Sequence, residues 1–167
     1  DQVMDALHVA DSTVVADLGA GGGWFTVRLA RRVGPNGRVY AVDVQRLMIE
    51  AIERRVQREG YTNVTAIVGA YDDPRLPPDA RTDAVLIVDA FHEMEDPVLL
   101  LRNVARTLKP QGRIGIIDYR QGEGGPGPGP EERVPPDVVV ADAAAAGLKL
   151  VERHTFLPYQ YFLIFGR

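Results

Sequence analysis

The chain has 167 residues, which suits one domain with a sizeable core and is short for two. It is 46% hydrophobic and 25% charged with a formal net charge of -4, so its charge makes no case for a nucleic-acid partner. It contains no cysteine, which excludes disulfides, thiolate metal sites and cysteine nucleophiles.

The same features predict a cytoplasmic protein without a membrane span. No apolar run approaches the roughly 20 residues of a membrane-spanning helix. The N-terminus also lacks the basic segment and apolar core of a signal peptide. Because the chain begins at Asp1 without a methionine, removal of an upstream segment stays an open alternative.

The first half of the chain predicts helices and strands in alternation. Apolar side chains at helical spacing indicate helices, and β-branched alternating stretches indicate strands. The predicted elements are a short helix at 1–8, a strand at 13–17, a helix from the glycines to 34, a strand at 37–43, a helix at 45–59 and a strand at 63–68.

The second half continues this alternation and then breaks it. The uninterrupted apolar run 83–89 is typical of a strand buried on both faces. It is followed by a helix from 96 that ends at 109–112, a strand at 113–119, a Gly/Pro-rich surface loop at about 121–136, a helix at 138–146 and two strands joined by a turn at 156–159. These elements predict an α/β fold, a doubly wound, mostly parallel sheet with an antiparallel edge, in a single domain.

A glycine-rich turn follows the first strand. Asp17, Gly19, Gly21 and Gly23 give the spacing D-x-G-x-G-x-G, whereas dinucleotide folds have G-x-G-x-x-G and this chain has Trp24 at the last position. A carboxylate before the glycines would repel a pyrophosphate but could hold an ammonium group, directly or through water. The turn therefore favours a ligand with a cationic amino-acid end over NAD, although geometry alone can also require such glycines.

Further polar residues follow the other strands. Asp43 ends the second strand, residues 69–73 follow the third, and Asp89 ends the fourth. The carboxyl ends of parallel strands line one crevice, so these residues are expected to converge with Asp17. A carboxylate at Asp43 can accept both hydroxyls of a ribose; an exposed strand-end aspartate is the alternative reading.

Four motifs in order carry a family resemblance: D-L-G-A-G-G-G-W-F-T, A-V-D-V-Q, L-I-V-D-A-F-H-E-M and L-K-P-Q-G-R-I. Together they resemble the class I S-adenosylmethionine-dependent methyltransferases, in particular the small-molecule group similar to the ubiquinone/menaquinone methyltransferases. The resemblance implies seven strands in the order 3-2-1-4-5-7-6 with strand 7 antiparallel. It implies methyl transfer from S-adenosyl-L-methionine to a small-molecule acceptor, with S-adenosyl-L-homocysteine as product.

The resemblance also assigns residues to parts of the cofactor. The amino-acid part would contact Asp17, Gly19 and Gly21, the ribose Asp43, and the adenine Val44, Met48 and either Tyr71 or Asp72. Asp89, Ala90 and His92 would lie beside the sulfonium.

Candidate catalytic side chains are few. A general base is needed only if the acceptor must lose a proton, and His92, beside Glu93, is the preferred base because imidazole titrates near neutral pH. A purely structural histidine in this loop is the alternative. Trp24 and Phe25 are interpreted as packing residues, with stacking against the substrate as the alternative. No metal site is expected, because H-E-M-E-D lacks the histidine pair of a zinc helix.

The acceptor side leaves alternatives open. Family members usually carry helices before the first strand and an insertion after the fifth, whereas this chain has one short helix and the Gly/Pro-rich loop. The pocket is then open, covered by an upstream segment, or covered by a second subunit in a homodimer. Rival functions are a methyltransferase-like domain that binds cofactor or a partner without turnover, a nicotinamide oxidoreductase, and a nucleic-acid methyltransferase, the last disfavoured by D-A-F-H after the fourth strand.

Overall fold

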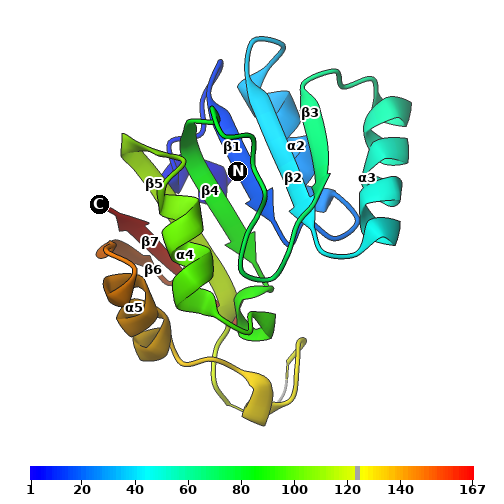
Figure 1. Cartoon of the computed structure of the whole chain (residues 1–167). Coiled ribbons are helices and arrows are strands. Elements are labelled where there is room, and N and C mark those ends of the chain that lie inside the picture. The colour runs from blue at the N-terminus through cyan, green and yellow to red at the C-terminus, as the bar shows by residue number, and fades with distance from the viewer. Residues whose placement is uncertain (123–124) are drawn as a thin grey trace.

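The computed structural model describes residues 1–122 and 125–167 and contains a seven-stranded sheet with helices on both faces (Figure 1). The strand order is β3-β2-β1-β4-β5-β7-β6. The pairs from β3 to β5 are parallel, and β7 runs antiparallel to both β5 and β6. The strand order and the antiparallel edge predicted from the sequence are confirmed.

The elements follow the predicted alternation along the chain. Their bounds are α1 Gln2–Ala6, β1 Val14–Leu18, α2 Trp24–Val33, β2 Arg38–Asp43, α3 Arg46–Glu59, β3 Val64–Val68, β4 Thr82–Val88, η1 Phe91–Glu93, α4 Pro97–Ala105, β5 Leu108–Tyr119, η2 Pro130–Glu132, α5 Pro136–Ala145, β6 Lys149–His154 and β7 Gln160–Gly166. Every helix among the described residues falls short of the length and apolar character that a bilayer crossing needs.

The sheet has a separate apolar cluster on each face. Ala16 of β1 packs in the cluster formed with α4 and α5, and its neighbour Val15 packs in the cluster formed with α1 and α2. Adjacent residues of a strand point to opposite faces, so a central strand needs apolar side chains on both. This requirement explains the apolar run from Ala84 to Val88 of β4 and the apolar residues on either side of Asp17 in β1, which hold the polar residues in fixed positions.

Two predicted boundaries are wrong. The helix expected to run to residues 109–112 ends at Ala105, and residues 109–112 lie within β5, where the pairing with β4 shifts register. The sequence Lys109-Pro110-Gln111-Gly112 looks locally like a helix stop. Pairing with β4 makes β5 begin earlier than predicted, at Leu108. The Gly/Pro-rich loop contains one short 3-10 turn, η2, and its residues 123–124 lie outside the described part of the chain.

We expect Ile116→Ala to lower the free energy of unfolding by about 2–5 kcal/mol, because Ile116 is fully buried beneath α4 and α5. Urea denaturation followed by circular dichroism measures this loss. Val151→Ala, at an exposed position of the edge strand β6, is the control and should change stability by less than about 0.5 kcal/mol. Equal losses in the two variants would contradict the assignment of the core.

Candidate functional site

The glycine turn joins β1 to α2 through left-handed backbone conformations. Gly19, Gly21 and Gly23 have φ angles of 70°, 56° and 89°. A Cβ on Gly19 would lie 2.6 Å from Cβ of Ala90, which follows β4, so only glycine lets the two turns approach this closely. A Cβ on Gly21 would meet no atom within 4 Å, because this residue borders an open cavity.

Asp43, the last residue of β2, fixes this turn in place. Its Oδ2 accepts a hydrogen bond from the backbone N–H of Gly21 at 2.9 Å, and its Oδ1 accepts one from Gln45 N–H at 2.9 Å. One carboxylate therefore ties the β1–α2 turn to the β2–α3 turn across the sheet edge. Each oxygen retains lone-pair capacity, and the side chain borders the cavity.

Asp17 lies beneath the same turn and is almost fully buried. Thr26 Oγ1 of α2 donates a hydrogen bond to Asp17 Oδ2 at 2.8 Å. Burial raises the pKa of Asp17 from 3.8 to about 6; the Thr26 hydroxyl opposes this shift and the nearby Asp43 adds to it. The described cavity lining does not include Asp17, so the side chain supports the turn from below.

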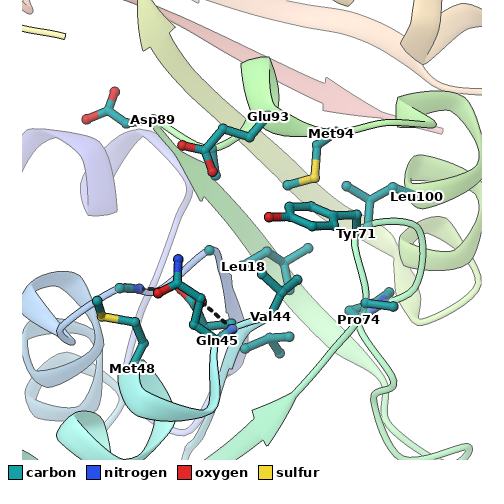
Figure 2. Close-up of a pocket in the computed structure, with 16 residues that line it drawn as sticks. Leu18, Val44, Gln45, Met48, Tyr71, Pro74, Asp89, Glu93, Met94 and Leu100 are labelled. Carbon is teal, nitrogen blue, oxygen red and sulfur yellow. Dashed lines mark hydrogen bonds between the residues drawn. The ribbon is translucent and has the colours of Figure 1, made fainter. Parts of the chain in front are cut away.

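A cavity of about 210 Å³ opens at the carboxyl ends of β1, β2 and β4. Figure 2 shows Asp89 and Glu93 on one side of it and Gln45 and Met48 on the other, with the Tyr71 ring reaching in between. The end near Met94 and Leu100 is apolar. This is a pocket for a molecule with an apolar, flat part and a polar part.

The charged residues that line this cavity are all acidic: Asp43, Asp89 and Glu93. None of its described lining residues is a lysine, arginine or histidine. Asp89 has a φ of 53°, and Gln160 Nε2 of β7 donates a hydrogen bond to its Oδ1 at 2.5 Å. Burial raises the pKa of Asp89, which Gln160 partly offsets. The cavity therefore favours a cationic ligand over a phosphate.

His92 of η1 is held by Asp118 at the end of β5. Its Nδ1 lies 3.0 Å from both oxygens of the Asp118 carboxylate, which also accepts from the backbone N–H of His92 at 3.0 Å and of Tyr119 at 2.8 Å. An ionised carboxylate only accepts hydrogen bonds, so Nδ1 carries the proton and neutral His92 has a free lone pair on Nε2. Nε2 lies 3.7 Å from Glu93 Oε1.

Most of the residues singled out from the sequence lie around this cavity. Its lining includes Gly19, Gly21, Asp43, Val44, Met48, Tyr71, Asp89 and Ala90. Asp17, Asp72 and His92 are outside the described lining, and the Asp72 carbonyl accepts a hydrogen bond from Asn103. Trp24, interpreted as a packing residue, is 54% exposed at the first position of α2, and its ring contacts Phe25 and the guanidinium of Arg28.

Three polar residues of this region were given no role from the sequence, namely Asp118, Gln45 and Gln160, and Glu93 was named only as the neighbour of His92. Asp118 ends the apolar run I-G-I-I-D, which hides it among strand residues. A buried carboxylate needs a hydrogen-bond partner, so its place in this run was a signal that the sequence offered. Gln45 lies in the turn after β2, and Glu93 ends η1, which follows β4. Gln160 had no signal along the chain, because its contact with Asp89 depends on the insertion of β7 beside β5.

Asp17→Asn is expected to stabilise the ligand-free protein at pH 8. A pKa raised from 3.8 to about 6 means that the ionised carboxylate costs the folded state about 3 kcal/mol, and asparagine can still accept from Thr26. The wild type should lose stability as pH rises from about 4 to about 6, and the variant should not. Thermal unfolding across pH 4–8 measures this; parallel curves for the two proteins would contradict it.

Comparison with known proteins gives three relevant similarities. A family model described as a methyltransferase domain matches residues 15–112. The demethylmenaquinone methyltransferase of Anoxybacillus flavithermus is 31% identical over 119 residues, which are 71% of this chain and 49% of that protein. The ubiquinone/menaquinone biosynthesis C-methyltransferase of Pasteurella multocida is 29% identical over 116 residues, 70% of this chain and 43% of that protein.

The chain thus spans about half the length of the curated relatives it matches. Among solved structures, a SAM-dependent methyltransferase from Aquifex aeolicus has a TM-score of 0.92 at 27% identity. The match covers 98% of this chain and 87% of the Aquifex chain. The family model covers more than half of the chain, and the strand order is that of the class I fold. The chain therefore belongs to the methyltransferase domain family, among the class I S-adenosylmethionine-dependent methyltransferases.

Proposed function

We propose that this chain transfers a methyl group from S-adenosyl-L-methionine to a small-molecule acceptor. The observation that carries the proposal is the cavity beside the glycine turn, whose charged lining residues are three carboxylates. S-adenosyl-L-methionine has a sulfonium and an ammonium group, and carboxylates stabilise both. A dinucleotide would instead bring a pyrophosphate to the glycine turn, beside this acidic lining, which is unfavourable.

The residues present fit this cofactor. The open space at Gly21 leaves the backbone accessible to an amino-acid group, above the buried Asp17. Asp43 keeps lone pairs for two ribose hydroxyls while it holds the turn. Val44, Met48 and Tyr71 offer apolar surface for the adenine, with Asp72 in the same loop, and Asp89 and Ala90 form the wall where we place the sulfonium.

The bound cofactor supplies a methyl group on a positively charged sulfur, a leaving group that needs no protonation. The protein then has to align the acceptor and exclude water. Where the acceptor loses a proton, we assign its removal to Nε2 of His92, with Asp118 holding the Nδ1–H tautomer. Glu93 and Asp118 then stabilise the imidazolium between them.

We infer that the chain acts as a single domain on a small molecule, without nucleic acid, in the cytoplasm. Its net charge of -4 and the carboxylates of the cavity both disfavour a nucleic-acid substrate. The relatives named demethylmenaquinone methyltransferases make demethylmenaquinone the first acceptor to test. A homodimer is one way to cover the acceptor side, because the described chain presents one short helix there, α1.

Isothermal titration calorimetry should detect S-adenosyl-L-methionine and S-adenosyl-L-homocysteine with dissociation constants on the order of 10 μM. Asp43→Ala should weaken both by about 10- to 100-fold, because it removes the acceptor of the ribose hydroxyls and releases Gly21. Asp83→Ala is the matched control: its carboxylate also accepts a backbone N–H, from Val14, but at the opposite edge of the sheet. The absence of binding heat with either ligand would end the proposal.

With demethylmenaquinone as acceptor, His92→Gln should lower kcat by about 100-fold and change the pH profile of the rate, because it removes the general base. His8→Asn is the control; His8 has a φ of 57°, which asparagine tolerates, and it lies outside the cavity lining. An unchanged rate and pH profile in His92→Gln would restrict His92 to a structural role. Cofactor binding without transfer to any acceptor would favour a domain that binds without turnover.

A further inference from the structure

The side chain of Gln160 connects the antiparallel edge of the sheet to the wall of the cavity. Its Nε2 donates a hydrogen bond to Oδ1 of Asp89 at 2.5 Å, and Asp89 lies at the edge of the cavity (Figure 2). Gln160 is the first residue of β7 and Asp89 follows β4, so the contact crosses β5, which lies between these two strands. The strand β7 thus reaches the site through this side chain.

The backbone is fixed on both sides of this contact. Gln160 pairs with Tyr119 of β5, and its carbonyl accepts a hydrogen bond from Arg120 Nε at 3.1 Å. The N–H of Asp89 donates to the Ile117 carbonyl at 2.8 Å, and its φ of 53° is a left-handed conformation that aspartate tolerates better than most residues. The two side chains therefore meet from rigid positions, and the amide fixes the orientation of the carboxylate.

The donors that hold the two aspartates of the cavity lining are neutral. Gln160 offers an amide to Asp89, and Asp43 accepts from two backbone N–H groups. Within the described residues neither carboxylate forms a salt bridge with lysine or arginine. By contrast, Asp83 at the opposite edge of the sheet pairs with Lys109 Nζ at 3.0 Å. A neutral donor fixes a carboxylate and leaves its negative charge for a ligand, whereas a paired cation cancels that charge.

Gln160 also favours the charged form of Asp89. Burial raises the pKa of Asp89 above its usual value, and the negative charge of Asp118 adds to this rise. The hydrogen bond from Gln160 lowers the pKa again, helped by the Tyr119 hydroxyl and by His92. Loss of the amide would favour protonated, neutral Asp89, which attracts a cation only weakly. The amide therefore acts on both the position and the charge of the carboxylate.

We propose that Gln160 is a positioning residue for methyl transfer: its amide holds the Asp89 carboxylate beside the sulfonium, so that the cavity distinguishes the charged donor from the neutral thioether product. This inference rests on the proposed function, because it requires that the cavity binds S-adenosyl-L-methionine. It deepens that function by naming the side chain that makes Asp89 sensitive to the charge of the ligand. Donor and product share their adenosine and amino-acid parts, so a change in their relative affinity reports on the methylated sulfur alone.

The test compares the dissociation constants of S-adenosyl-L-methionine and S-adenosyl-L-homocysteine by calorimetry. Asp89→Asn removes the charge and should shift their ratio toward the product by about tenfold. Gln160→Met keeps the length of the side chain without the donor and should shift the ratio in the same direction by about threefold. In the double variant Gln160→Met should add nothing to Asp89→Asn, because Gln160 acts through the Asp89 charge. Gln57→Met, at an exposed position of α3 outside the described lining, is the matched control and should leave the ratio unchanged.

An unchanged ratio in Gln160→Met, or a further shift when it is added to Asp89→Asn, would overturn the inference. Loss of affinity for both ligands by the same factor would likewise restrict Gln160 to a structural role. If circular dichroism shows that Gln160→Met does not fold, Gln160→Asn replaces it: its shorter amide does not reach Asp89 and should shift the ratio in the same direction. Failure of the proposed function has a different signature, because the wild-type protein would then give no binding heat with either ligand, and the inference would fall with it.

Discussion

The structure of the site depends on the two hydrogen bonds of the Asp43 carboxylate. The glycine turn is built from left-handed residues that a short turn does not hold rigidly by itself, and its open side faces a cavity. Asp43 binds the N–H of Gly21 and that of Gln45, so the turns after β1 and β2 move as one unit. The group that organises the turn is thereby also the group best placed to meet a ligand.

This organisation has a cost in the ligand-free protein. Asp17 is buried with a raised pKa, and Asp89 has a left-handed backbone and a raised pKa of its own. Carboxylates that are poorly solvated and close together destabilise the folded state when they ionise. A cationic ligand reverses this, since it neutralises the same charges. We therefore regard the unfavourable electrostatics as part of the affinity for a sulfonium compound.

Local patterns were sufficient to predict the antiparallel edge and most of the cavity, because polar residues stand at or just after the ends of β2 and β4, whereas the full strand order came from the family resemblance. What they did not reveal depends on pairing between distant segments. Asp118 gains its role from His92, 26 residues away, and Gln160 from Asp89, 71 residues away. Trp24 could not be oriented from the sequence, because an aromatic residue at a helix start is compatible with either face until α1 and the β6–β7 turn are placed.

The distribution of charge in the cavity bears on the order of events in methyl transfer. The acidic cavity attracts the cationic donor, and after transfer the neutral thioether product has lost the sulfonium charge that the carboxylates stabilise. The same carboxylates therefore hold the donor more tightly than the product, which favours release of the product once the methyl group has moved.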